Sequence, residues 1–309
     1  MADLPTPPSG EQFEIAFGDQ RAVAVEVGGA LRTYSAGGRD LLDGYPADSM
    51  SSSGRGQVLL PWPNRIQDGT YEFAGRSHQL PINEQAANNA IHGLVRWAPW
   101  ALRAREPSRV AVEQVLHPQP GYPFTLHVVI EYALAEGGLS VSTTATNTGA
   151  EACPLGAGNH PYVTAGTAVV DEAVLHAPAR TVLRSDERGI PTGAGPVDGT
   201  EYDFRAGREI GATRLDNCFT DLARDGDGLA RVELLRPDGG GVALWMDASY
   251  PYVMLFTGDP LPDVSRRSLA IEPMSCPPDA FRSGQALVRL EPGESWSGRW
   301  GINPVRAAS

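Results

Sequence analysis

Apolar and polar residues alternate with a period of two along much of the chain. The longest example covers residues 124–134, where every second residue is apolar and His127 is one of those between. A Gly-Gly pair at 137–138 follows, and the alternation resumes over residues 139–145. Because successive side chains of a strand point to opposite faces, this pattern predicts a long antiparallel hairpin with one buried face and His127 on the outer face.

Shorter stretches repeat the same order of strand, glycine-containing turn and strand. They predict four further hairpins, over residues 23–34, 71–75, 232–246 and 287–300.

Turn signals are frequent, since the chain has 35 glycines and 26 prolines among 309 residues. No long segment has helical periodicity, and no linker divides the chain. Residues 183–204 are turn-rich and are expected to form an excursion carried on the sheet. We therefore predict an all-β sandwich in one domain, residues 1–309, with a flexible segment at residues 1–12.

Charge and composition exclude several classes of function. The net charge is −12, so the chain lacks the basic stripe that nucleic acid or an anionic membrane requires, and a neutral ligand fits better. All 25 cationic residues are arginines. Without lysine, neither Schiff-base catalysis nor covalently held pyridoxal is possible.

The N-terminal residues show neither a cationic start nor an apolar run, so we expect no signal peptide. No stretch approaches the roughly 20 apolar residues that span a bilayer. Three cysteines, Cys153, Cys218 and Cys276, are too few and too separated for a disulfide framework or a zinc pattern. We expect a cytoplasmic protein, monomeric or homodimeric, whose partner is a small molecule.

Three short polar motifs interrupt the strand pattern. Asn-Arg-Ile at 64–66 precedes Ile-His-Gly at 91–93, Gly-Asn-His-Pro-Tyr occupies 158–162, and Ile-Glu-Pro-Met occupies 271–274. Together they offer two imidazoles, a guanidinium and a carboxylate. Such a set can hold a polyol and move protons on and off two of its oxygens.

His160 and Glu272 are the strongest candidates for proton transfer. Small and rigid neighbours fix the backbone of His160, although a lone histidine is about as often a structural residue. Glu272 lies in an apolar strand end, where burial raises the pKa of a carboxyl group towards the range of a general base. A structural pair between Glu272 and an arginine is the alternative.

Other residues have weaker signals. Arg65 has the donors to bind a polyol or to pair with a buried acid. The Asp216 carboxylate is suited to accept a hydrogen bond from a sugar hydroxyl or to cap a turn. Trp62 and Trp97 are candidates to stack on a sugar ring, although aromatic residues are also common in β cores. Each cysteine lies near a motif, so a Cys-His nucleophile is conceivable, but small buried thiols are the simpler interpretation.

Taken jointly, the motifs resemble the aldose 1-epimerase (mutarotase) family over roughly residues 24–300. The resemblance implies a large antiparallel β-supersandwich of the galactose mutarotase type, without a metal or an organic cofactor. It also implies the roles of five residues. His160 would be the general acid and Glu272 the general base, while Arg65, His92 and Asp216 would bind the sugar.

The chain departs from the galactose-active members after the acid histidine. They continue with a Tyr-Phe-Asn-Leu type run, whereas residues 161–164 here read Pro-Tyr-Val-Thr. The acid-base pair is unaffected, but galactose preference is not implied.

The expected function is interconversion of the α and β anomers of a neutral aldose by ring opening and reclosure. One rival is a hexose-6-phosphate 1-epimerase, for which Arg55, Arg96, Arg266 and Arg267 are available to bind phosphate. Another is a non-catalytic sugar-binding protein on the same fold. A hydrolase that uses Asp216 and Glu272 ranks lower, because it leaves the histidines without a role.

Overall fold

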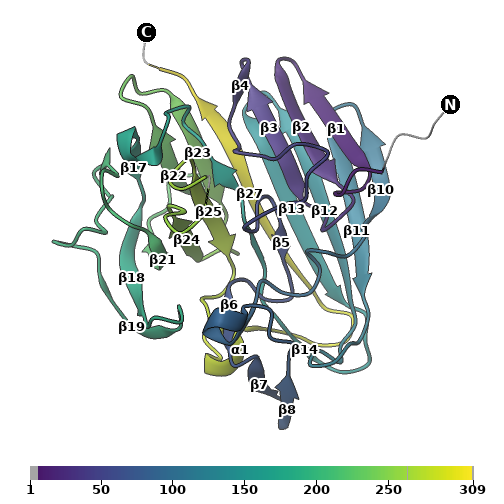
Figure 1. Cartoon of the computed structure of the whole chain (residues 1–309). Coiled ribbons are helices and arrows are strands. Elements are labelled where there is room, and N and C mark those ends of the chain that lie inside the picture. The colour runs from purple at the N-terminus through teal and green to yellow at the C-terminus, as the bar shows by residue number, and fades with distance from the viewer. Residues whose placement is uncertain (1–5, 263, 308–309) are drawn as a thin grey trace.

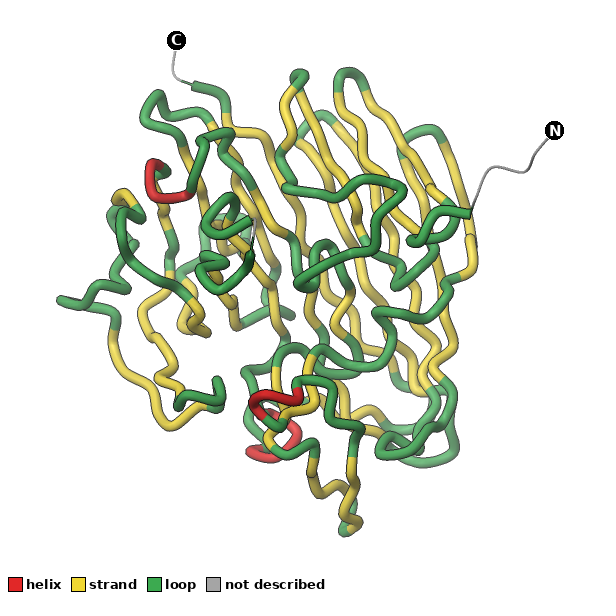
Figure 2. The backbone as a smooth tube through the Cα atoms, viewed as in Figure 1, coloured by secondary structure: helices red, strands yellow, loops and turns green. Residues whose placement is uncertain are grey.

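The computed structural model describes residues 6–262 and 264–307 and is almost entirely β (Figures 1 and 2). The helical elements of this described part are the short α1 (Ala280–Ser283) and two 3₁₀ turns, η1 (Gln85–Ala87) and η2 (Val170–Glu172). None of its helices has the length and apolar character needed to cross a bilayer. The predicted all-β fold is confirmed.

A nine-stranded antiparallel sheet forms the largest layer. Its strands, in spatial order, are β10 (Ala101–Glu106), β11 (Arg109–Leu116), β12 (Leu126–Ala135), β13 (Gly138–Asn147), β27 (Ser295–Val305), β23 (Gly241–Met246), β22 (Ala230–Leu235), β17 (Val174–His176) and β20 (Arg208–Glu209). In β12 the predicted inner residues are buried and His127 is partly exposed, which confirms the longest predicted hairpin.

An eight-stranded sheet carries most of the motif residues. Its strands, in order, are β19 (Pro191–Pro196), β18 (Ala179–Ser185), β21 (Asp216–Leu222), β24 (Tyr252–Phe256), β25 (Leu269–Met274), β15 (Gly158–Asn159) and β5 (Val58–Leu59), and β16 (Tyr162–Val163) also pairs with β25. The turn-rich segment 183–204 supplies the edge hairpin β18–β19, as expected of an excursion on the sheet.

Smaller elements cover the ends of these sheets. The four-stranded sheet β1 (Gln12–Phe17), β2 (Gln20–Val25), β3 (Leu31–Ala36) and β4 (Arg39–Asp40) packs against β11 and β12 (Figure 1). Three two-stranded units complete the fold: β6 (Arg65–Gln67) with β9 (Asn89–Ile91), β7 (Thr70–Phe73) with β8 (Arg76–Gln79), and β14 (Cys153–Leu155) with β26 (Val288–Leu290).

One of the predicted hairpins is wrong. Residues 287–300 do form two strands around a turn, but β26 pairs with β14, whereas β27 pairs with β13 and β23. The turn therefore carries the chain from one sheet to another. The hairpins at 23–34, 71–75 and 232–246 are present as β2–β3, β7–β8 and β22–β23.

A single cluster of buried apolar side chains joins the sheets. Trp300, on β27 of the nine-stranded sheet, is 1% exposed, and its indole N–H donates a hydrogen bond of 2.9 Å to Asn159 Oδ1 on β15 of the eight-stranded sheet. The residue after Asn159 is His160. The candidate acid is thus attached to the main core.

Candidate active site

His160 and Glu272 face each other because of the strand register. β15 pairs with β25 at Gly158 and Met274, and β16 pairs with the same strand at Tyr162 and Ala270. His160 lies midway between Gly158 and Tyr162 in the sequence. Glu272 lies midway between their partners, Met274 and Ala270. The two motifs, about 110 positions apart, therefore share the same rungs of the sheet.

The side chains of this pair are in contact. His160 Nε2 lies 3.3 Å from Glu272 Oε1, and both side chains are buried, at 6% and 3% exposed. Glu272 comes from β25, in which all six residues are buried. Neighbouring prolines leave the ladder incomplete here, since Pro161 and Pro273 have no N–H to donate.

Packing fixes the His160 ring on two sides. The Tyr162 ring stacks on it with centroids 4.9 Å apart, and the Arg55 guanidinium lies over the other face of the stack, 4.4 Å from the centroid of Tyr162. Gly54 lies so close that a Cβ there would be 2.6 Å from His160 Cδ2. The imidazole therefore has little freedom to rotate.

The Asn-Arg-Ile and Ile-His-Gly motifs meet at the end of the β6–β9 pair. Arg65 pairs with Ile91, so Asn64 and His92 lie just beyond the last rung. Both have left-handed backbones, with φ of 53° and 64°, and His92 N–H donates to the Asn64 carbonyl at 2.9 Å. Non-glycine residues in this region are sparse and concentrate at functional sites.

This strained junction points His92 at His160. Their ring centroids are 5.3 Å apart at an angle of 76°. The next residue, Gly93, has φ of 70°, and a Cβ there would lie 2.0 Å from the Leu60 carbonyl oxygen. Glycine is therefore required after His92, which accounts for the His-Gly pair.

Arg65 is held by a carboxylate in the plane of its guanidinium. Its Nε donates to Glu84 Oε2 and its Nη2 to Glu84 Oε1, each at 3.0 Å, and its backbone N–H donates to Asn64 Oδ1 at 3.0 Å. Gly189 packs against it, since a Cβ there would be 2.5 Å from Arg65 Nη1. The guanidinium is thus oriented before any ligand arrives.

All five predicted site residues line one cavity of about 300 Å³. They are His160, Glu272, Arg65, His92 and Asp216. Trp97, which is 50% exposed, also lines it, whereas Trp62 is 2% exposed, packs against Phe281 and is not part of the lining. Of the two tryptophans, Trp97 is the one placed to meet a ligand.

Burial favours the uncharged forms of the central pair. It lowers the pKa of the His160 imidazole to about 3, and nearby Arg55 and Arg96 act in the same direction. Burial, together with the charge of Asp216, raises the pKa of Glu272 well above its ordinary value, against the opposing charge of Arg65. The pKa of His92 is lowered well below its ordinary value by burial, and its neighbours His160, Arg96 and Arg65 act in the same direction.

Several donors and acceptors of the site are unused. His92 Nδ1, His160 Nδ1 and Glu272 Oε2 are buried and have no hydrogen-bond partner among the described residues. Buried polar atoms without partners are costly, so they mark a place where a polar ligand completes the structure. A sugar, with a hydroxyl on nearly every carbon, supplies such atoms.

The thiol nucleophile receives no support from the geometry. None of the three cysteines lines the cavity, and all are free and buried. Burial raises the pKa of Cys153 to about 11 and that of Cys276 to about 12, so these thiols stay protonated.

Sequence reasoning missed Glu84, the partner of Arg65, and Gly54, the neighbour of His160. Glu84 lies in a polar stretch before η1, and Gly54 lies in an irregular segment before β5, where nothing local sets either apart. Three of the four arginines considered for phosphate pair with acids away from the cavity lining: Arg55 and Arg267 with Asp43, and Arg266 with Asp171. Arg96 alone among the four lines the cavity.

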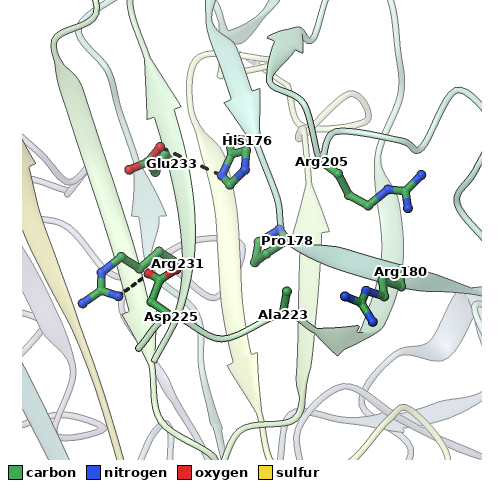
Figure 3. Close-up of a pocket in the computed structure, with 8 residues that line it drawn as sticks. All are labelled: His176, Pro178, Arg180, Arg205, Ala223, Asp225, Arg231 and Glu233. Atoms are coloured by element: carbon green, nitrogen blue, oxygen red, sulfur yellow. Dashed lines mark hydrogen bonds and ion pairs between the residues drawn. The ribbon is translucent and has the colours of Figure 1, made fainter. Parts of the chain in front are cut away.

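A second hollow lies elsewhere on the surface and includes none of these residues (Figure 3). Arg231 in this hollow pairs with Asp225, Arg205 pairs with Asp203 outside it, and His176 lies 3.9 Å from Glu233. It is not a candidate for the same chemistry.

Comparison with known proteins identifies the family of the chain. The family model described as aldose 1-epimerase matches residues 11–303. The chain belongs to the aldose 1-epimerase family. It is 37% identical over 288 residues to the uncharacterized protein YihR of Escherichia coli K12, covering 93% of this chain and 91% of the relative.

Solved structures of this family share the fold. A GalM/aldose epimerase homologue from C. elegans superposes with a TM-score of 0.84 at 21% identity, covering 96% of this chain and 99% of that one. A galactose 1-epimerase from Lactobacillus acidophilus NCFM gives a TM-score of 0.77 at 20% identity, covering 94% and 93%. At these identities the likeness concerns the fold alone.

Proposed function

We propose that this member of the aldose 1-epimerase family interconverts the α and β anomers of an aldose, with His160 and Glu272 as the acid-base pair. The observation that carries the proposal is their 3.3 Å contact inside a cavity of about 300 Å³ that also holds Arg65, His92 and Asp216. Family membership supports the reaction class, and the unused polar atoms support a polyol ligand.

In the proposed mechanism, the one proton that the pair shares moves from Glu272 to His160 when the sugar binds. Glu272 then removes the proton of the anomeric hydroxyl while His160 donates a proton to the ring oxygen. The bond between C1 and the ring oxygen breaks, and the open aldehyde rotates about C1–C2. The reverse transfers close the opposite anomer and restore both groups. Each well-placed proton transfer contributes about 10²–10⁴-fold to the rate.

The surrounding residues orient the sugar. Arg65, fixed by Glu84, presents a rigid donor, while His92 and Asp216 reach hydroxyls from other sides of the cavity. Trp97 offers an aromatic face at the rim. Free, buried cysteines are consistent with the cytoplasmic, reducing setting that we include in the proposal. The proposal also includes one domain for the whole chain. Of the segment 1–12 that the sequence predicts to be flexible, residues 1–5 lie outside the described residues, whereas Gln12 begins strand β1.

Polarimetry of freshly dissolved α-glucose and α-galactose tests the proposal. We expect the wild-type protein to accelerate mutarotation, and Glu272→Gln and His160→Ala each to lower kcat by roughly 10²–10⁴-fold. His127→Ala is the control, since His127 makes a 3.0 Å contact with Glu113 at the surface. Sugar binding without acceleration by the wild type would instead indicate a non-catalytic binding protein.

One observation favours a second candidate, an aldose that carries a phosphate. Arg96 lines the cavity, and no carboxylate of the described residues forms an ion pair with it; burial lowers its pKa with no acid acting in the other direction. An unpaired guanidinium is a ready partner for an anionic group. A higher kcat/KM for glucose 6-phosphate than for glucose, reduced by Arg96→Gln, would support this candidate; equal effects on both sugars would reject it.

A further inference from the structure

Three side chains of the metal-ligating type converge in the cavity. One ligand atom each from His92, His160 and Glu272 lie within 4.8 Å of one another, and the residues are 8%, 5% and 2% exposed. An Nδ1 on each imidazole and Oε2 of the carboxylate have no partner among the described residues. Two imidazoles and one carboxylate form a donor set that Zn²⁺ and similar divalent transition metals accept.

We propose that Zn²⁺ binds to His92, His160 and Glu272 as a reversible inhibitor that excludes the sugar. The inference rests on the proposed function for its effect on catalysis, but not for the binding of the metal itself.

The lining of the cavity is close to charge balance. Glu84 compensates Arg65 through two hydrogen bonds, and the lining also holds one further acid, Asp216, and one further guanidinium, Arg96. Glu272 would bind Zn²⁺ as a carboxylate, so metal binding releases the proton that burial keeps on this group.

The geometry predicts that the ligand atoms move closer together when the metal binds. Bonds of about 2.1 Å in a tetrahedral site place neighbouring ligand atoms about 3.4 Å apart. Ligand atoms that lie up to 4.8 Å apart must therefore approach by as much as about 1.4 Å. Rotation of the Glu272 and His92 side chains can supply this. The cavity leaves room for a water molecule as the fourth ligand, as in zinc sites with an open position.

Competition follows from the shared atoms. His160 and Glu272 are proposed to exchange protons with the sugar and His92 to bind it, so Zn²⁺ held by these three side chains and the sugar cannot be bound at once. We therefore expect Zn²⁺ to raise the apparent KM without changing kcat, and a chelator to restore the original KM.

Binding is tested by titrating chelator-treated protein with Zn²⁺ in competition with a chromophoric chelator. We expect one site in the wild type, weakened at least tenfold by His92→Gln and by Glu272→Gln. His127→Gln, at the surface pair with Glu113, is the matched control and should keep the site. Circular dichroism verifies that each variant is folded. The two variants change distant parts of the chain, so the test remains valid if one of them fails to fold.

Each outcome of the titration and of polarimetry with added Zn²⁺ is distinct. A Zn²⁺ site that is lost in His92→Gln, in a protein that does not accelerate mutarotation, would leave the metal site standing and reject the proposed function. Accelerated mutarotation with no Zn²⁺ binding, or with binding that both variants retain, would overturn the metal site alone.

Discussion

At the scale of single residues, the main feature is a buried acid and a buried base that share one proton. Burial raises the pKa of Glu272 and lowers that of His160. The pair thus takes up a second proton only in acid and gives up its last proton only well above the ordinary titration range of a carboxyl group. Because the two groups are in contact, these two steps belong to the pair as a whole.

This predicts a broad, bell-shaped dependence of kcat on pH. The one-proton state is the active one, since it holds one group able to donate and one able to accept. As pH falls, we expect activity to be lost only below the ordinary pKa of an imidazole, about 6.5. As pH rises, we expect it to be lost only well above the ordinary pKa of a carboxyl group, about 4.5. Polarimetry across pH measures both limbs; an acid limb centred near 6.5 would show that His160 titrates as an ordinary exposed histidine.

At the scale of elements, the site is built where strands end. Left-handed backbones at Asn64 and His92 turn the β6–β9 pair towards the cavity, and the gap between β15 and β16 places His160 on the rung of Glu272. The loop before β5 packs against the His160 imidazole at Gly54. Loop residues therefore set the orientation of groups whose positions the strands fix.

Replacing Gly54 with alanine tests this orientation. Its φ is 78°, and the new Cβ would lie 2.6 Å from His160 Cδ2, so we expect the ring to shift and kcat to fall roughly 10- to 100-fold. Gly75→Ala is the matched control: its φ is 75°, and a Cβ there meets nothing within 4 Å. Both variants bear a similar strain of about 1–2 kcal/mol. Equal kcat values in the two would refute a positioning role for Gly54.

How much the sequence could predict also depends on the element. The alternation of apolar and polar residues was sufficient to predict the hairpin of β12 and β13, because each strand buries a single face. It failed for residues 287–300, where a local turn signal cannot tell a hairpin from a crossing between sheets. Polar residues in apolar strands pointed to His160 and Glu272 as candidates, and the resemblance to a known family supplied the roles expected of Arg65, His92 and Asp216. Glu84 and Gly54 act through tertiary contacts that leave no local pattern.

At the scale of the whole molecule, a buried hydrogen bond connects the candidate site to the core between the two large sheets. The buried hydrogen bond from Trp300 to Asn159 links β27 with the residue before His160. A second tryptophan bond, from Trp245 Nε1 to Asn303 Oδ1 at 3.0 Å, lies within the nine-stranded sheet. The two bonds are chemically alike but differ in what they connect.

Their removal should therefore have different effects. Trp300→Phe leaves a buried acceptor on Asn159 without its donor, and we expect the free energy of unfolding to fall by about 1–3 kcal/mol, with kcat reduced as well. Trp245→Phe, the control, should leave kcat unchanged. Urea unfolding and polarimetry measure the two quantities, and an unchanged kcat in Trp300→Phe would mean that the site does not depend on this link.

The most direct test of the account is a double-mutant cycle on the acid and the base, read by the rate of mutarotation. If His160 and Glu272 act as one proton-transferring pair, His160→Gln/Glu272→Gln should be no slower than the slower single variant. The same cycle on the surface pair His127 and Glu113 should leave the rate unchanged throughout. Losses at His160 and Glu272 that simply multiply in the double variant would contradict the account.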